Sequence, residues 1–380
     1  KLIFYFIIIN YMTDLTGGKL IGEGSSTCVF KPNLPCKNKK IDISDKRVAK
    51  LFLKKPDDLY KELKTNKKIS KLPKSKEWSV VLDDMCEAAD YNTLKSVEPD
   101  IDKCLKNNEM TSLPKESLIF FGDYGGVSMD IAFMTHMIDS KDMIDICKKY
   151  NSFIEQCESL FLGLKIMYEN ETMHYDIKSG NITYNDDKYK YIDFGISTTF
   201  KNTKQIEKRA LQEFSTDRIY VYYPYDILYL YPSKPRLYIE NNTTHRRNYD
   251  DVKDLHEIVF DRDYDMEWQN VMDLALSGKL NDKQTIEKLD TYSLGFTLTK
   301  LLLDYCIKRF KMLNDYDLYL LIKDVFDCEL LDGIFELLKD MTEPLSTNRI
   351  NPIEAYNRYK RSEEHTSELQ SPMYLVCRLL

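Results

Sequence analysis

Several residue patterns that would assign a protein class at once are missing from this 380-residue chain. Its nine cysteines include no C-x-x-C pair and no cluster with histidine, so the common zinc-site patterns are excluded and the thiols are predicted to be reduced, in a reducing compartment. A disulfide between Cys28 and Cys36 stays open as the minor alternative. The formal net charge of −7 argues against a general binder of nucleic-acid backbones, because such proteins concentrate Lys and Arg on one face.

Long hydrophobic runs are missing as well. The apolar run from Leu2 to Ile9 is far shorter than the roughly 20 residues that a membrane-spanning helix needs, and no small-residue cleavage pattern follows it, as a signal peptide would require. We therefore expect no membrane partner. Because Met12 opens a polar stretch, residues 1–11 are interpreted as normally untranslated upstream sequence. Residues 361–380 read like the in-frame translation of a sequencing-library adapter and are excluded from fold reasoning.

Hydrophobic patterning divides the remaining chain into two parts. Residues 12–124 carry short runs of β-branched and aromatic residues, such as Arg47–Phe52, which predict a small sheet interrupted by one helix at 57–72. Helices dominate residues 125–360, including two without internal proline at 144–169 and 291–310. We therefore expect the α+β class, with a mostly β lobe followed by a larger, mostly α lobe and a glycine-containing connector between them.

A glycine loop opens the first part. The sequence Gly22-Glu-Gly24-Ser-Ser-Thr27-Cys-Val29 follows an apolar pair and runs into another predicted strand. Glycines at such a turn let backbone N–H groups approach phosphate oxygens closely, so Gly22, Gly24 and Val29 are candidate phosphate-binding residues. By itself the pattern also fits an ordinary hairpin, and the residues further along the chain must decide between the two.

Lys50 and Glu62 come next in the chain. Lys50 lies on a predicted strand, where a half-buried ammonium group needs an anionic partner, and the two candidates are nucleotide phosphates and Glu62 on the following helix. Taken alone, each residue is more typical of a solvated surface. Their order after a glycine loop favours a nucleotide site instead.

The most specific segment lies further along the chain. His174-Tyr-Asp176-Ile-Lys178-Ser-Gly-Asn181 closes a predicted helix, and Asp193-Phe-Gly195 comes after strand-like residues. Phosphoryl transfer needs a carboxylate that accepts the proton of the attacking hydroxyl, a lysine that stabilises the transferring group, and an amide and a second carboxylate that hold magnesium. These roles are assigned, in that order, to Asp176, Lys178, Asn181 and Asp193.

These motifs, in this order, resemble those of the eukaryotic-type protein kinases over residues 22–349. The resemblance implies a bilobal fold, with ATP and Mg²⁺ (Mn²⁺ as an alternative ion) as cofactors and Lys50 as an ATP ligand. It also implies a protein substrate whose Ser or Thr hydroxyl accepts the γ-phosphoryl group, because Lys178 is what serine/threonine kinases carry two residues after the catalytic Asp176.

The same resemblance implies supporting roles for residues outside the catalytic motifs. Asp290-Thr-Tyr-Ser-Leu-Gly295 resembles the family's D-x-W-S-L-G helix, whose aspartate anchors the catalytic loop. Tyr223-Pro-Tyr-Asp226 stands where A-P-E is expected, and Arg349 stands where its salt-bridge arginine is expected. The residues expected to give structural support are His174, Gly195, Asp226, Asp290 and Arg349.

Three residues depart from the family's pattern. Tyr175 replaces the arginine that receives an activation-loop phosphate in many members, so we expect activity without that phosphate. Thr27 stands at the third glycine position and is predicted to stiffen the phosphate loop. Asp226 replaces a glutamate and shortens a structural ion pair. None of these changes removes a catalytic group.

Residues 228–288 form a longer stretch than the family usually has at this place, and they include His245-Arg-Arg247 and many Asp and Tyr residues. We interpret the stretch as a solvated insertion. A docking surface for a substrate or partner is the alternative.

The phrase Cys28-Val-Phe-Lys-Pro-Asn-Leu-Pro-Cys36, the Tyr-Gly-Gly connector and the Lys/Asn/Tyr/Ile-rich composition resemble kinases of large nucleocytoplasmic DNA viruses. That resemblance implies a cytoplasmic setting, in host cytoplasm or in a virion.

Two other functions stay open. A small-molecule kinase of related fold is disfavoured by Lys178, by the Asp290 motif and by the A-P-E-like segment. A pseudokinase that serves as a binding scaffold is disfavoured because Lys50, Asp176, Asn181 and Asp193 are all present.

Overall fold

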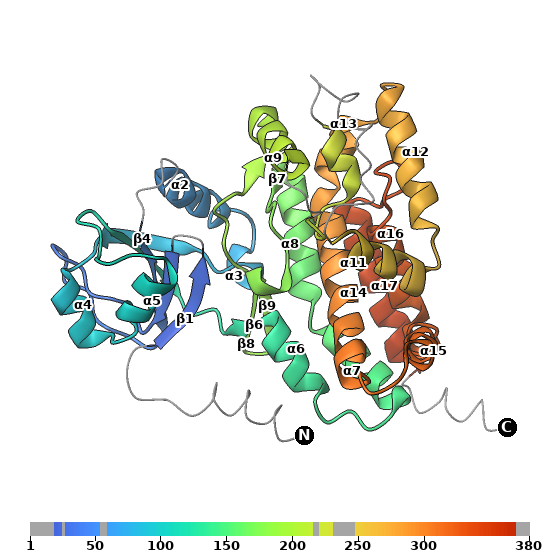
Figure 1. The fold of residues 1–380 in the computed structure, drawn as a ribbon, viewed down its shortest axis with the longest axis horizontal. Coiled ribbons are helices and arrows are strands. Elements are labelled where there is room, and N and C mark those ends of the chain that lie inside the picture. Colours follow the sequence, from blue (N-terminus) through green and yellow to red (C-terminus); the bar gives the residue numbers. More distant parts are fainter. Residues whose placement is uncertain (1–18, 25–26, 54–58, 216–219, 231–247, 370–380) are drawn as a thin grey trace. The chain divides into compact units, whose positions relative to one another are not determined.

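The computed structural model describes residues 19–24, 27–53, 59–215, 220–230 and 248–369, and these form two compact units. The first unit contains the described residues up to Lys71 together with Val80–Gly125, and the second contains Leu72–Ser79 and the described residues from Gly126 onward (Figure 1). A small antiparallel sheet region accompanied by many helices is compatible with a bilobal kinase fold.

The first unit is built on a five-stranded antiparallel sheet with the strand order β1-β2-β3-β5-β4. Because side chains alternate along a strand, Ala49 and Leu51 face one layer of the core, whereas Lys50 and Phe52 face the other. The predicted strand at 47–52 is therefore present, and it directs Lys50 away from the larger core. The strands are β1 (Lys19–Gly24), β2 (Thr27–Lys31), β3 (Arg47–Phe52), β4 (Leu82–Glu87) and β5 (Leu118–Asp123).

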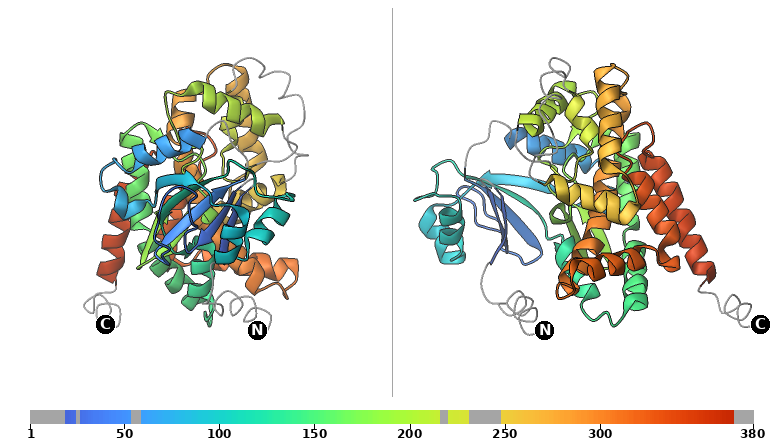
Figure 2. Two further views of the ribbon diagram at one scale, coloured as in Figure 1. Left: turned by 90° about the vertical axis from the view of Figure 1, so that its left-hand side faces the viewer. Right: turned by 45° about the vertical axis from the view of Figure 1, so that its right-hand side comes forward.

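Helices cover both faces of this sheet (Figure 2). On one face α4 (Tyr91–Val97) and α5 (Ile101–Asn107) bury apolar side chains such as Leu94 against Ala49 and Leu51. On the other face α2 (Leu59–Ile69) packs Leu59 and Leu63 against Phe52. The expectation of a single helix in this part was wrong, because α4 and α5 have only seven residues each and are too short for a clear helical period.

Two disulfides cross-link the first unit: Cys28 of β2 with Cys104 of α5, and Cys36 with Cys86 of β4. The prediction of reduced thiols is therefore wrong for these four residues, and the alternative Cys28–Cys36 pair is wrong as well. Alternation along β2 points Cys28 into the face that α5 covers, whereas Cys36 lies past the end of the strand and bridges to Ala88. The free cysteines among the described residues are Cys147, Cys157, Cys306 and Cys328.

The second unit is mostly helical, and its central element is α14 (Leu289–Arg309), which is buried along most of its length. The predicted helix at 291–310 corresponds to it. Among the described residues, no helix combines the length and the apolar character that crossing a bilayer requires. The long helices outside the predicted insertion are α6 (Met129–Met137), α7 (Met143–Glu155), α8 (Glu158–Glu169), α9 (Thr203–Ser215), α15 (Asp315–Phe326), α16 (Asp332–Met341) and α17 (Pro352–Leu369).

Two expectations about these helices need correction or extension. The predicted single helix at 144–169 is divided into α7 and α8, because the chain turns at Cys157, where ψ is 4°. No glycine or proline marks this turn in the sequence. Residues 361–369, which sequence reasoning excluded, continue α17, whereas residues 1–11 and 370–380 lie outside the described part of the chain.

Two small sheets frame the segments that carry the motifs. Strands β6 (Val127–Ser128), β8 (Ile182–Asn185) and β9 (Lys188–Tyr191) pair in the order β6-β8-β9. Strand β7 (Thr172–Met173) pairs with β10 (Thr198–Thr199). The segment 174–181 therefore connects β7 to β8, and the segment 192–197 connects β9 to β10.

The short segment Leu72–Ser79 packs with the second unit although it lies between two stretches of the first. It contains the single-turn helix α3 (Ser75–Trp78), and Trp78 is fully buried. Its indole packs on Gly163 of α8, where a Cβ atom would lie only 2.9 Å from the indole ring. Glycine at position 163 therefore makes the space that Trp78 fills.

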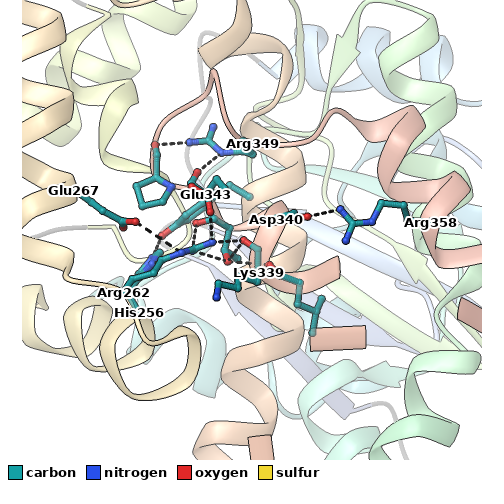
Figure 3. A network of polar contacts seen from close by, with 12 residues as sticks. His256, Arg262, Glu267, Lys339, Asp340, Glu343, Arg349 and Arg358 are labelled. Carbon is teal, nitrogen blue, oxygen red and sulfur yellow. Dashed lines mark hydrogen bonds and ion pairs between the residues drawn. The ribbon is translucent and has the colours of Figure 1, made fainter. Parts of the chain in front are cut away.

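Residues 248–288, the longer described part of the predicted insertion, pack into the second unit. Buried His256, Arg262 and Trp268 come from this stretch. The Arg262 guanidinium donates to the carbonyl of Lys339 (2.6 Å) and to Glu343 Oε1 (2.5 Å) (Figure 3).

The solvated interpretation is therefore wrong for these three residues, whose side chains are buried, whereas Asp250 and Asp265 of the same stretch are exposed. His245-Arg-Arg247 lies outside the described residues. The helices of residues 248–288 are α11 (Tyr249–Asp254), the π-helical η4 (Leu255–Val259), α12 (Tyr264–Leu276) and α13 (Asp282–Glu287).

Candidate active site

The segment 174–181 is anchored at its start by Asp290 of α14. The His174 N–H donates to Asp290 Oδ2 (2.6 Å), and the Tyr175 N–H donates to Oδ1 (3.0 Å). Burial raises the pKa of the Asp290 carboxyl, although His174 and the two N–H donors oppose this. Tyr175 has a φ of 69°, a left-handed conformation that costs a non-glycine residue free energy. The two bonds to Asp290 therefore hold the strained turn that leads into Asp176.

His174 ties this segment to the segment that carries Asp193. Its fully buried ring places Nε2 2.9 Å from the Ile192 carbonyl oxygen, and the ring of Phe194 packs 4.8 Å from it between centroids. Ser197 Oγ donates to the His174 carbonyl at 2.9 Å. Both motifs are thus held against one buried imidazole.

The Asp176 carboxylate is the centre of the site. Its Oδ2 accepts hydrogen bonds from Lys178 Nζ (2.9 Å) and from Asn181 Nδ2 (2.7 Å). Its Oδ1 accepts a hydrogen bond from the Tyr220 hydroxyl at 2.5 Å. The Asp176 side chain is 17% exposed, so a hydroxyl from outside can reach a carboxylate that the protein already orients.

Asn181 and Asp193 supply the oxygen atoms that suit a magnesium ion. Asn181 Nδ2 also donates to the Asp176 carbonyl (2.9 Å), which leaves the amide oxygen outside these bonds. The Ile192 N–H donates to the Asn181 carbonyl at 3.0 Å, and Asp193 is the next residue.

Mg²⁺ typically takes one or two such protein oxygens and completes its shell with water and substrate phosphates. Among the described residues, no three His, Cys, Asp or Glu side chains are arranged to hold a metal. Asn181 and Asp193 remain the predicted ligands, with donor oxygens of the kind that Mg²⁺ takes.

In the first unit, Lys50 and Glu62 form a buried ion pair. Lys50 Nζ lies 2.8 Å from Glu62 Oε1, and the two side chains are 14% and 11% exposed. Lys50 faces the side of the sheet that α2 covers, because side chains alternate along β3 and Ala49 faces the other side. Glu62 belongs to α2 itself. Withdrawing these charges from water costs free energy that a hydrophobic pair would avoid.

The glycine loop is the hairpin between β1 and β2. Gly22 lies opposite Val29, and Gly24 lies opposite Thr27. A Cβ atom at Gly24 would lie 2.7 Å from the Thr27 hydroxyl oxygen, so a larger residue at position 24 would require the Thr27 side chain to move. Residues 25 and 26, at the tip of the loop, lie outside the described part of the chain.

Asp226 and Arg349 meet in the interior of the second unit. Arg349 Nη2 lies 3.1 Å from Asp226 Oδ2, and both side chains are fully buried. Burial raises the pKa of the Asp226 carboxyl above its ordinary value although the guanidinium opposes this. Arg349 Nε also donates to the Glu343 carbonyl at 2.7 Å (Figure 3). The pair fixes the end of the segment that begins at Tyr220.

Sequence reasoning did not single out Tyr220, whose hydroxyl contacts Asp176 across 44 positions of the chain. A signal was available, because three tyrosines occur within the four residues before Pro224. Their spacing could not show that one of them reaches the Asp176 carboxylate.

No family model matches the chain. A curated relative, the probable serine/threonine-protein kinase FPV212 of fowlpox virus (strain NVSL), is 26% identical over 192 residues. The match supports a divergent, kinase-like relationship. The aligned residues make up 49% of this chain, and the chain spans about half of the relative, 53% of its length.

Proposed function

We propose that the chain is a divergent protein kinase of bilobal fold that transfers the γ-phosphoryl group of Mg-ATP to Ser or Thr hydroxyls of a protein substrate. The observation that carries this proposal is the Asp176 carboxylate, which is held by Lys178 and Asn181 on one oxygen and touches a hydroxyl group on the other. The fowlpox relative supports the kinase class of the activity.

Each residue has a defined part in this chemistry. Asp176 accepts the proton of the acceptor hydroxyl, and Lys178 places a positive charge beside the group that moves. Bound Mg²⁺ would neutralise phosphate charge. Asn181 and Asp193 are the residues that would hold this ion. Lys50, fixed by Glu62, is the candidate for a contact with the nucleotide phosphates.

The test is phosphoryl transfer from radiolabelled ATP to mixed protein substrates by the purified chain. Asp176→Asn keeps the size of the side chain but removes its capacity to accept the proton, so transfer should fall about 10²–10⁴-fold while nucleotide binding is retained. Asp193→Ala should abolish the magnesium-dependent reaction. Asp139→Asn, at an exposed position of the same unit, is the matched control and should behave as wild type.

The outcomes separate the proposal from its rivals. Undiminished transfer by Asp176→Asn would refute the role of this carboxylate. Wild-type protein that binds nucleotide but transfers nothing would favour a binding scaffold. Transfer to amino sugars or choline, with none to proteins, would favour a small-molecule kinase.

A further inference from the structure

Two tyrosines that belong to none of the recognised motifs contact the segment that carries Asp176. The Tyr220 hydroxyl donates to Asp176 Oδ1 (2.5 Å) and lies 3.4 Å from Lys178 Nζ. The Tyr223 hydroxyl donates to the Tyr175 carbonyl at 2.5 Å. The segment from Tyr220 to Asp226 is therefore hydrogen-bonded to two consecutive residues, Tyr175 and Asp176, of the segment 174–181.

The aromatic rings reinforce these bonds. The rings of Tyr175 and Tyr223 stack at 5.4 Å between centroids, and the ring of Tyr220 packs edge-on against Tyr223 at 4.8 Å. The Tyr175 hydroxyl donates to the carbonyl of Ile206 in α9 at 3.3 Å. Such aromatic pairs stabilise beyond their buried area, and the Arg209 guanidinium of α9 also lies 5.9 Å from the ring centroids of Tyr220 and Tyr223. The segment 174–181, α9 and the segment from Tyr220 to Asp226 are therefore joined through these rings.

The chemistry of the two phenols suits a permanent bond. Burial and the neighbouring Asp176 charge raise the pKa of Tyr220, and burial raises the pKa of Tyr223 well above its ordinary value. Both hydroxyls therefore keep their protons at neutral pH and remain donors. A carboxylate oxygen can accept two hydrogen bonds, so Oδ1 of Asp176 can take the proton of an acceptor hydroxyl while Tyr220 stays in place.

We propose that Tyr220 is a positioning residue of the phosphotransfer site: its hydroxyl holds Asp176 Oδ1 toward the acceptor, and the stacked Tyr175–Tyr223 pair keeps Tyr220 there without a phosphate group. This proposal rests on the proposed kinase function. It gives a physical role to Tyr175, which stands where many kinases carry a phosphate-binding arginine. The clamp formed by Tyr175, Tyr220 and Tyr223 orients the base through its own hydroxyl and ring contacts, with no phosphate group among them.

Tyr220→Phe tests the proposal because it removes one oxygen atom and keeps the ring contacts. We expect kcat for protein phosphorylation to fall about tenfold, the loss expected for one hydrogen bond to a charged group. The KM for ATP should stay at its wild-type value, and the variant should remain folded at the assay temperature in thermal unfolding, so that the loss is confined to kcat. Tyr316→Phe, at an exposed tyrosine of α15, is the control and should match wild type.

A second measurement distinguishes action through Asp176 from an independent effect. In the Asp176→Asn background, Tyr220→Phe should cause no further loss, because the group that Tyr220 positions is already disabled. Additive losses would overturn the proposal. Phosphatase treatment of the wild type should leave kcat unchanged, and a large loss would contradict a clamp that works without phosphate.

Two further results would overturn the proposal in favour of other roles. A faster Tyr220→Phe variant would mean that the hydroxyl blocks the acceptor position. Stoichiometric phosphate on Tyr220, measured by peptide mass spectrometry after incubation with Mg-ATP, would mean that Tyr220 is itself an acceptor. If the wild type transfers phosphate and Tyr220→Phe transfers it equally well, only this inference is refuted. If the wild type transfers no phosphate, the proposed function is refuted as well.

Discussion

Replacing Arg349 by methionine removes the partner of a fully buried carboxylate and keeps an apolar chain of similar length. Asp226 then either stays charged and unpaired, at a cost of about 3–5 kcal/mol, or takes up a proton. For a group whose ordinary pKa is 3.8, protonation at pH 7 costs about 4 kcal/mol. The two routes agree, and we expect Arg349→Met to lower the free energy of unfolding of the second unit by about 4 kcal/mol at pH 7.

The pH dependence of this loss has a definite sign. Burial already raises the pKa of Asp226 in the folded protein, and removing Arg349 raises it further. The folded state therefore binds the proton more readily than the unfolded state, and the variant regains stability as the pH falls. The loss should shrink by about 1.4 kcal/mol per pH unit, to about 2 kcal/mol at pH 5.5.

Urea unfolding followed by tryptophan fluorescence measures this loss selectively, because both tryptophans of the chain, Trp78 and Trp268, belong to the second unit. Arg358→Met removes the partly exposed ion pair with Asp340 and should cost less than about 1 kcal/mol. Adding Asp226→Asn to Arg349→Met should recover much of the loss. A cost below about 1 kcal/mol at pH 7, or a cost that does not change with pH, would refute the reasoning.

Three further predictions concern other parts of the chain. Reducing the two disulfides, whose partners lie 76 and 50 positions apart, should destabilise the first unit by about 4 kcal/mol for each bond. Tryptophan fluorescence should not change. Equal stability of the oxidised and reduced protein would contradict the cross-links. Lys50→Met should raise the KM for ATP or abolish transfer without unfolding the sheet, as circular dichroism and nucleotide titration would reveal. Burial raises the pKa of Glu267 from 4.5 to about 7, so the folded state binds more protons between these values and its stability falls as the pH rises through this window. Glu267→Gln should remove about 1–2 kcal/mol of the stability change over this pH window. The same change in the variant, in unfolding experiments at several pH values, would count against the assignment.

Local patterns made part of the site predictable. Lys50 could be placed on a strand because β-branched and aromatic residues lie around it in a short run. The segment from His174 to Asn181 could be recognised because its polar residues fall within eight consecutive positions. The structure places Asp290 on the backbone of His174 and Tyr175, a contact over more than a hundred positions that only the resemblance to kinases had indicated.

Contacts that depend on which way a side chain faces could not be predicted. The pairing of Cys28 with Cys104 follows from the face of β2 that α5 covers, and the separation of two cysteines along the chain carries no such information. Trp268 and Arg262 are buried in a stretch whose many Asp and Tyr residues indicated a solvated surface. Tyr220 lies on a segment that is also held by the bond from Tyr223 to the Tyr175 carbonyl and by the Asp226–Arg349 ion pair.

The packing of Trp78 on Gly163 has a consequence for how the chain can be divided into fragments. The first unit is discontinuous in sequence, because Leu72–Ser79 leaves it and packs with the second. A fragment that begins at Gly126 lacks this indole and leaves an empty space over α8, at a cost comparable to the 3–5 kcal/mol typical of deleting a large buried aromatic side chain. A fragment that ends at Gly125 carries Trp78 without the surface that buries it. We therefore expect a peptide of residues 72–79, added to the fragment that begins at Gly126, to restore part of the stability that this fragment lacks alone.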